Sequence, residues 1–438
     1  MNDKIFLDPS EMPKAWYNIL PDLPFQLDPP LDPETMKAIS PDKLVQLFPE
    51  KVVELNASRE RWIEIPEPVR EILATWRPVP LTRALRLERA LGTPARIYYK
   101  YEGTNITGSV KLNSAIPQAY YLKEEGGKRI VTETGAGQWG CAAAVAAAEF
   151  GLQCKVFMVR ISYEQKPQRL SMMRAFGANV VFSPSTETSV GRGVIAKNPS
   201  HKGSLGIAIG EVIEEIRENG GGKYLFGSIL NTVCMHQTIV GLEAKLQMEK
   251  AGEYPDIIIG CHGGGSNFAG ITFPYVPDKL NGKPIRMIAV EPSACPSLTK
   301  GKFRYDYGDL SRTTPLLKMY TLGCDFTPPA MHAGGLRHHG SSPITAALYH
   351  HGIIEAKALP QTHVFKRSLE FLKAEHIVVA PEAAHAVAAT IDEALECKRT
   401  GEAKTILVCI SGHGLFDTSA YDDYFAGRLT DEEYSVAA

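Results

Sequence analysis

From about residue 97 onward, apolar runs of strand length alternate with longer segments of helical character. The runs predicted to be buried strands are residues 96–101, 130–132, 153–159, 179–182, 256–261, 285–290 and 405–410. The segments predicted to be helices are residues 109–125, 137–150, 167–176, 204–219 and 381–398. Strands that alternate with helices form mostly parallel sheets covered by helices on both faces, so the pattern predicts an α/β fold.

The first 75 residues have a different pattern. They are rich in proline and acidic residues, which predicts an extended arm with one or two short helices, such as residues 41–48. A helical stretch near residues 83–91 follows. The polar segment 184–202 predicts a loop. We therefore expect an N-terminal arm followed by two larger domains.

The composition narrows the class of protein. The 438 residues are 44% hydrophobic and 22% charged, which is typical of a globular chain rather than a disordered one. A net charge of −2 argues against nucleic acid or an anionic membrane as a partner. No signal-peptide core or bilayer-spanning run is present, and the eight cysteines form no C-x-x-C pair. We expect a cytoplasmic protein with neither a disulfide scaffold nor a metal-ligating cluster.

The clearest candidate for chemistry is the run Gly260-Cys261-His262-Gly263-Gly264-Gly265-Ser266-Asn267, which follows a buried strand. Glycines let the backbone approach an anion closely, and the N–H groups at a following helix, predicted from Phe268, favour negative charge. The run therefore suggests a phosphate cradle. A tight turn that needs small residues explains it equally well.

Three further segments lie at strand ends or helix starts. They are Ser109-Val110-Lys111-Leu112-Asn113, Glu133-Thr134-Gly135-Ala136-Gly137-Gln138 and Cys409-Ile410-Ser411-Gly412-His413-Gly414. Each has an ordinary alternative: a solvated lysine behind a Ser109 cap, a glycine-rich turn, and a capping serine. Ligands bind at this edge of open α/β sheets, and four such turns would rarely carry an amine, a carboxylate, a hydroxyl and a phosphate cradle by accident.

In order and spacing, these four segments resemble the tryptophan synthase beta chain family of fold-type II pyridoxal-phosphate (PLP) enzymes. The resemblance runs from about Trp76 to Asp417, and residues 201–209 and 334–337 are similar to its second, divergent branch. It implies two three-layer domains with mostly parallel sheets behind the arm of residues 1–75. The first would span residues 76–245, with a mobile communication region at about 126–215. The second would span residues 246–438 and carry the phosphate loop.

The resemblance also implies how the cofactor is held. Lys111 would form the Schiff base with PLP and move protons at the substrate Cα, Asn113 would hydrogen-bond the ring oxygen, and Ser411 would meet the pyridine nitrogen. Glu382 would lie near the ring, although a carboxylate at a helix N-terminus explains it equally well. The residues implied to hold the phosphate are Gly263, Gly264, Gly265, Ser266 and Asn267.

The implied reaction is β-replacement, in which indole and serine give tryptophan. Glu133 would stabilise positive charge that develops on the indole nitrogen. The residues implied to bind the substrate carboxylate are Thr134, Gly135, Ala136, Gly137 and Gln138.

Two positions depart from the family pattern. Val110 stands where a histidine is usual, which removes a donor near the phosphate. Arg337 stands where first-branch chains have an aspartate for the serine hydroxyl. A guanidinium suits a dianionic phosphate, so O-phosphoserine is a candidate substrate beside serine. The alternative is that Arg337 pairs with a structural carboxylate.

Other activities compete with this interpretation. They are serine or threonine deamination, threonine synthesis and a catalytically silent PLP-binding homologue. An NAD-linked oxidoreductase is disfavoured because the glycine run at residues 260–267 is not G-x-G-x-x-G. Glu133 favours the synthase, because simple elimination needs no carboxylate at the nucleophile position. The family also implies a homodimer and a monovalent cation, while contact with an alpha subunit is left open.

Overall fold

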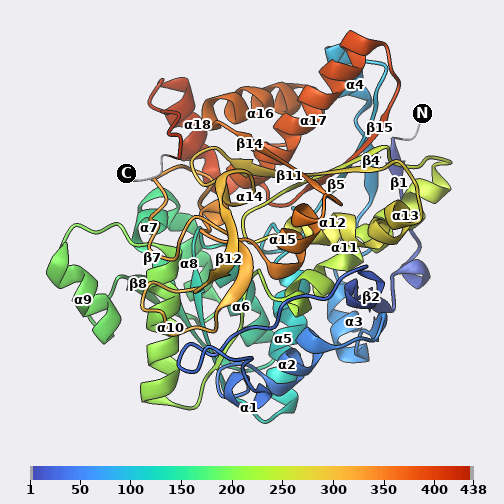
Figure 1. Cartoon of the computed structure of the whole chain (residues 1–438). Helices are drawn as coiled ribbons and strands as arrows, with labels where there is room; N and C mark the ends of the chain where they lie inside the picture. The colour runs from blue at the N-terminus through green and yellow to red at the C-terminus, as the bar shows by residue number, and fades with distance from the viewer. Residues whose placement is uncertain (1–2, 435–438) are drawn as a thin grey trace.

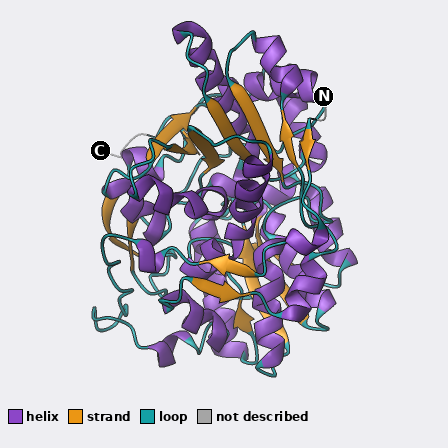
Figure 2. Ribbon diagram, turned by 90° about the vertical axis from the view of Figure 1, so that its right-hand side faces the viewer, coloured by secondary structure: helices purple, strands orange, loops and turns teal. Residues whose placement is uncertain are grey.

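The computed structural model of the chain describes residues 3–434, and these residues form two main sheets enclosed by helices (Figures 1 and 2). The larger sheet has the order β1 (Lys4–Ile5), β4 (Leu81–Arg83), β5 (Arg96–Tyr101), β15 (Thr405–Ile410), β10 (Ile257–Cys261), β11 (Arg286–Pro292) and β14 (Glu355–Leu359). It is parallel from β5 to β14 and antiparallel at β1 and β4. The smaller, parallel sheet has the order β8 (Asn179–Ser183), β7 (Gln153–Val159), β6 (Arg129–Thr134) and β9 (Lys223–Tyr224).

Alternating side chains divide the core of the larger sheet between two helical layers. In β10, Ile257 and Ile259 pack with residues of α17 (Pro381–Thr400) and α16 (Gln361–Glu375). Ile258 between them packs with α11 (Asn231–Lys250) and α12 (Ser266–Thr272) on the opposite face. Both faces are therefore buried, which is why the strand is a continuous apolar run in the sequence.

The smaller sheet is layered in the same way. Val131, Phe157 and Val181 pack against α10 (Leu205–Asn219). Ile130 and Val156 pack on the other face, against α6 (Gln138–Glu149) and α8 (Pro167–Ala175). The predicted α/β fold with mostly parallel sheets is confirmed.

The predicted strands and helices correspond to observed elements with shifts at their ends, and one local prediction, the loop at residues 184–202, was wrong. The helix expected from Ser109 begins later, as α5 (Leu112–Glu124). The helix expected from Phe268 begins at Ser266. The segment predicted as a loop contains α9 (Ser189–Lys197), whose N-cap Thr188 accepts a hydrogen bond from the Gly191 N–H.

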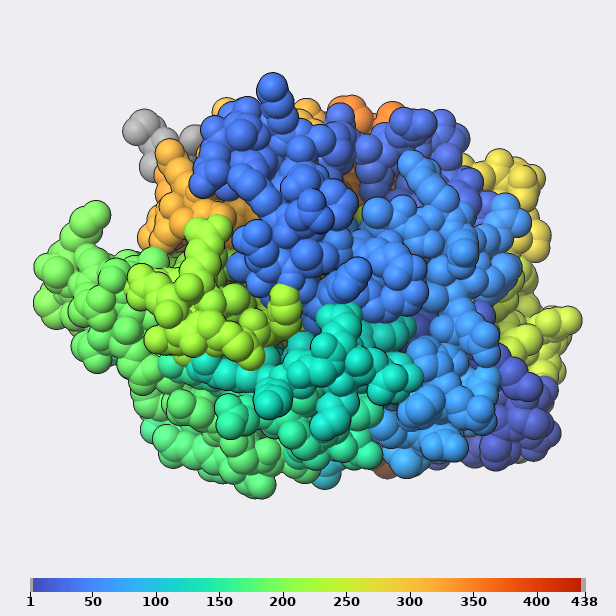
Figure 3. All heavy atoms as spheres, turned by 90° about the horizontal axis from the view of Figure 1, so that it is seen from below, coloured from blue at the N-terminus to red at the C-terminus, as the bar shows by residue number. Residues whose placement is uncertain are grey.

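The N-terminal arm is more structured than its composition predicted. It contains three α-helices, α1 (Pro41–Leu44), α2 (Glu50–Ala57) and α3 (Glu67–Leu73), and an antiparallel pair, β2 (Ala15–Tyr17) and β3 (Trp62–Glu64). Trp16 of β2 is fully buried beside His236 of α11. In Figure 3 the arm, in blue, covers much of one face of the molecule. Its tryptophan anchor makes the arm part of the core.

Sheet membership crosses the sequence division at residue 245. Strands β4 and β5 precede that position, yet they lie in the sheet formed chiefly by later strands, where β5 pairs with β15. The other elements are α4 (Leu85–Leu91), α7 (Arg160–Gln165), α13 (Val276–Leu280), α14 (Ser297–Lys300), β12 (Lys302–Asp306), β13 (Leu317–Thr321), α15 (Pro343–His350) and α18 (Thr418–Phe425).

The eight cysteines are all buried and free. Within residues 3–434, no helix is long and apolar enough to cross a membrane.

Candidate active site

The four segments singled out in the sequence converge on one cavity. The segment around Lys111 precedes α5, residues 135–137 join β6 to α6, residues 262–265 join β10 to α12, and Ser411 follows β15. The cavity is lined by Val110, Lys111, Glu133, Thr134, Gly135, Ala136, Gln138, Trp139, Leu205, Phe226, Gly227, Ser228, Cys261, Gly263, Gly264, Gly265, Ser266, Asn267, Gly334, Gly335, Leu336, His338, Glu382 and Ser411. It therefore lies at the carboxyl ends of parallel strands from both sheets.

Lys111 reaches into this cavity from the turn before α5. Its Nζ donates to the backbone carbonyl of Gly227 at 3.0 Å. Burial lowers the pKa of the Lys111 amine, and no carboxylate of the described residues forms an ion pair with it. A lowered pKa increases the fraction of the amine that is neutral and can act as a nucleophile.

The triple-glycine loop is shaped by close backbone contacts. A Cβ on Gly264 would lie 2.4 Å from Ser228 Oγ, and one on Gly263 would lie 2.9 Å from the Gly335 carbonyl. Gly265 has φ +110°, a conformation that L side chains rarely adopt. The loop thus presents its backbone to the cavity and leads directly into α12 at Ser266.

Glu133 is near the carboxyl end of β6 and lines the same cavity. The Tyr224 hydroxyl donates a hydrogen bond to Glu133 Oε2. Burial raises the pKa of Glu133 to about 7, although the Tyr224 hydrogen bond and the Lys111 charge act in the other direction. Next along the chain, Thr134 Oγ1 accepts from the N–H groups of Gly137 and Gly140, both at 3.1 Å, which folds the loop over the start of α6.

Ser411 contributes a hydroxyl to the cavity wall. Its Oγ accepts a hydrogen bond from the Val110 N–H at 3.2 Å, which joins the lysine turn to the end of β15. Val110, at the position where the family usually has a histidine, is buried, and the group it contributes here is its backbone N–H.

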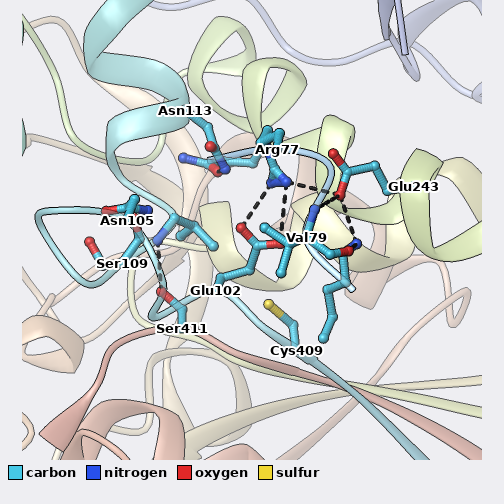
Figure 4. A network of polar contacts seen from close by, with 12 residues as sticks. Arg77, Val79, Glu102, Asn105, Ser109, Asn113, Glu243, Cys409 and Ser411 are labelled. Carbon is cyan, nitrogen blue, oxygen red and sulfur yellow. Dashed lines mark hydrogen bonds and ion pairs between the residues drawn. The ribbon is translucent and has the colours of Figure 1, made fainter. Parts of the chain in front are cut away.

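A buried ionic network lies beside this turn (Figure 4). The Arg77 guanidinium pairs with Glu102 at 2.8 Å and with Glu243 at 3.0 Å. Asn113, predicted as a cofactor ligand, is fully buried near this network, and its Nδ2 donates to Gln237 Oε1 at 3.2 Å. It does not line the cavity.

Glu382 has the position expected from both interpretations of the sequence, a residue near the cofactor and a carboxylate at a helix N-terminus. It is in the first turn of α17 and also lines the cavity. Its Oε1 accepts from the Gly335 N–H at 2.9 Å and lies 3.4 Å from Lys166 Nζ. Burial by itself raises the pKa of Glu382, but the charges of Lys166 and Arg169 outweigh it and lower the pKa to about 2.

Arg337 and Gly137 lie just outside the cavity wall. The Arg337 guanidinium donates to Ser162 Oγ at 2.6 Å and lines a small neighbouring cavity, which shares Gly135, Leu205 and Gly334 with the larger one. Among the described residues no carboxylate forms an ion pair with Arg337, so the structural pairing considered as an alternative is absent there. Burial lowers the pKa of Arg337 to about 10.

Sequence reasoning missed several residues of the site. Gly227 and Ser228 follow β9, a strand of two residues that is too short to show a period. Tyr224 and Lys166 belong to no motif. His338 lines the cavity, and burial lowers its pKa to about 3, so its imidazole is neutral.

Comparisons with known proteins agree with this geometry. Residues 72–412 match the family model described as "Pyridoxal-phosphate dependent enzyme". The chain is 58% identical to "Tryptophan synthase beta chain 2" of Thermotoga maritima over 95% of this chain and 98% of that one. It is 55% identical to the Aquifex aeolicus protein of the same name over 98% and 100% of the two chains.

The chain belongs to the tryptophan synthase beta chain family of PLP-dependent enzymes. Solved structures support the fold. A fungal L-serine ammonia-lyase from Rhizomucor miehei superposes with a TM-score of 0.60 at 15% identity, covering 80% of this chain and 98% of that one. O-acetyl serine sulfhydrylase isoform 3 from Entamoeba histolytica has a TM-score of 0.57 at 20% identity, covering 86% and 95%.

The residues of this family member fit PLP. An amine with a lowered pKa and no counterion suits the aldehyde, and a glycine loop that a Cβ would obstruct suits a phosphate. The Ser411 hydroxyl can face a ring nitrogen. Lys111, residues 263–267 and Ser411 would therefore hold the cofactor.

Proposed function

We propose that this chain condenses indole with L-serine, or with O-phospho-L-serine, to form L-tryptophan by PLP-dependent β-replacement. The observation that carries the proposal is the position of Glu133, a carboxylate that shares one cavity with the amine of Lys111. Replacement requires a group that stabilises the attacking nucleophile, whereas simple elimination does not.

When bound, PLP withdraws electrons from the substrate Cα and so permits loss of the α-proton and of the β-leaving group. Lys111 removes and returns the proton at Cα, a role that suits an amine whose pKa is lowered. The loop of residues 134–138, which is held closed by Thr134 Oγ1, positions the substrate carboxylate.

A second cavity supports an apolar, aromatic co-substrate. Its volume is about 80 Å³ and its wall is largely apolar. Phe226 lines both this cavity and the active-site cavity, and Tyr224 lines it beside the hydrogen bond to Glu133. An indole ring would have apolar surroundings there. A small polar reactant such as water or an ammonium ion would not need such a wall. The Glu133 carboxylate then stabilises positive charge on the indole nitrogen.

Product analysis tests the reaction. Purified holoenzyme with serine and indole is expected to form tryptophan, and Glu133→Gln is expected to lose this product while it still releases pyruvate and ammonia. Pyruvate as the main product of the wild type with saturating indole would favour a deaminase instead.

For the donor, we propose O-phosphoserine over serine. The buried Arg337 guanidinium lacks a carboxylate partner among the described residues, and it lies in a cavity that adjoins the substrate loop at Gly135. A bidentate guanidinium suits a dianionic phosphate. Steady-state kinetics with both donors tests the idea: the wild type should prefer phosphoserine, and Arg337→Gln should lose that preference. Equal or better turnover of serine by the wild type contradicts it.

We further propose a cytoplasmic homodimer, which the family resemblance suggests. Light scattering of the purified holoenzyme should give twice the chain mass of 48.0 kDa. The 48.0 kDa mass alone, over a range of concentrations, would refute the dimer.

A further inference from the structure

The N-terminal arm passes close to the catalytic glutamate. Strand β9 is an edge strand, paired with β6 on one side only. Its other side is taken by residues 44–48, which we call the arm turn. The Tyr224 N–H donates to the Leu47 carbonyl at 2.7 Å, and Lys223 Nζ donates to the Val45 carbonyl. In Figure 3 the blue arm lies against later segments of the chain on this face.

The side chain of Tyr224 continues the connection inward. Its ring stacks on Phe48 of the arm turn, with centroids 5.6 Å apart and an interplanar angle of 16°. Its hydroxyl donates to Glu133 Oε2, and the whole residue is buried. One side chain thus joins the arm turn to the carboxylate of the proposed mechanism.

The arm turn is itself held firmly. Just after it, the N–H groups of Glu50 and Lys51 at the start of α2 donate to the Glu125 carboxylate, both at 2.9 Å. Further along α2, the Val52 carbonyl accepts from Thr232 Oγ1 at 2.9 Å. The turn is therefore a fixed support rather than a loose cover.

We propose that Tyr224, braced by the arm turn, is a positioning residue for the reaction: it holds one oxygen of Glu133 and leaves the other for the nucleophile. This rests on the proposed function. Rotation of a free glutamate in an enclosed site would spread its charge over several positions. A phenol that donates to Oε2 restricts it to one and favours its ionised form.

The charged and titratable groups around Glu133 are few. Lys111 lines the same cavity and its charge favours the carboxylate, Tyr224 donates to it, and the charge of Asp309 acts on Tyr224. Loss of the phenol removes the largest of the influences that lower the pKa of Glu133 and keep it ionised. The carboxyl of Glu133 should then titrate at a higher pH.

The test is Tyr224→Phe, which keeps the ring and its stacking on Phe48. Infrared difference titration of the cofactor-free protein follows the carboxyl of Glu133, identified by its disappearance in Glu133→Gln. We expect its midpoint to rise by roughly one pH unit, because one charge-assisted hydrogen bond is lost. In the holoenzyme, kcat for tryptophan formation should fall about tenfold or more, while elimination of serine without indole stays within about twofold.

Two further variants make the result specific. Tyr254→Phe removes a similar phenol–carboxylate hydrogen bond, to Asp278 at 2.7 Å, from residues that do not line the cavity, and it should change neither readout. Phe48→Leu removes the stacking from the arm turn and should lower kcat for replacement less than Tyr224→Phe does, with elimination again unchanged.

Several outcomes would overturn the positioning role. They are an unchanged Glu133 midpoint in Tyr224→Phe, an equal shift in Tyr254→Phe, or a parallel loss of replacement and elimination. If the wild type forms no tryptophan but the Glu133 midpoint rises in Tyr224→Phe, the proposed function fails and the hydrogen-bond role stands. If the wild type forms tryptophan and the midpoint does not move, only the positioning role fails.

Discussion

Two walls of the active-site cavity are built in contrasting ways. The wall from the larger sheet is a loop of three glycines, where the backbone itself faces the ligand and added side-chain atoms would clash. The wall from the smaller sheet places a side chain, Glu133, at the end of β6 and holds it with Tyr224. The first binds by shape, and the second acts by charge and orientation.

Because the two walls are built differently, they should be sensitive to different substitutions. A backbone cradle depends on local chain geometry, so it is sensitive to any residue with a Cβ. A positioned carboxylate depends on partners brought from β9 and the arm turn, so it is sensitive to distant changes. Lys111 serves both walls, because its amine is near the cradle and its charge favours ionisation of Glu133.

The largest effect is expected for Lys111→Ala, because it removes the amine that serves both walls of the cavity. Loss of the amine should abolish the visible absorbance of the internal cofactor linkage and reduce kcat by roughly 10³-fold or more. Absorbance spectra and turnover of the same preparation check this. An unchanged spectrum would mean that another amine carries the cofactor.

The next largest effect is expected for Glu133→Gln, which changes the side-chain wall and leaves the backbone wall as it is. Tryptophan formation should fall by about 10²-fold, since a neutral amide stabilises positive charge poorly, while cofactor affinity stays the same. Turnover with indole and equilibrium binding of PLP measure the two effects. A large loss of affinity would show that the two walls are not independent.

The third prediction concerns Gly264→Ala, which should damage the backbone wall alone. The new Cβ would meet Ser228 Oγ at 2.4 Å, so we expect PLP affinity to fall about 10- to 100-fold. Gly193→Ala in α9 is the matched control, because a Cβ there meets no atom within 4 Å. Titration of both variants with PLP tests this, and equal affinities would contradict the cradle.

The smallest effect is the pH dependence of the side-chain wall. The pKa of Glu133 is raised by burial to about 7, so the carboxylate is present above that pH and is protonated below it. Tryptophan formation should therefore fall about tenfold from pH 8 to pH 6. Elimination of serine without indole should not fall over this pH range. If elimination falls in the same way, the titrating group is not Glu133.

Sequence reasoning placed the chemistry better than the scaffold around it. The three glycines, Lys111, Glu133 and Ser411 were found because each directly follows a strand or precedes a helix, a position that local patterns identify. Asn113 was expected at the cofactor; in the structure its side chain donates to Gln237, and it is not among the residues that line the cavity. Two-residue strands such as β9 were missed because alternation needs length.

By itself, the sequence determined which chemical groups occur at the ends of strands, since glycine content, strand length and helix starts are properties of short segments. Only the tertiary structure decided what holds those groups. Tyr224 supports Glu133 across 91 residues, Lys166 pairs with Glu382 across 216, and the arm turn reaches Tyr224 from the N-terminal region of the chain. Such contacts form because distant segments share a buried surface, and no local pattern records which surfaces will meet.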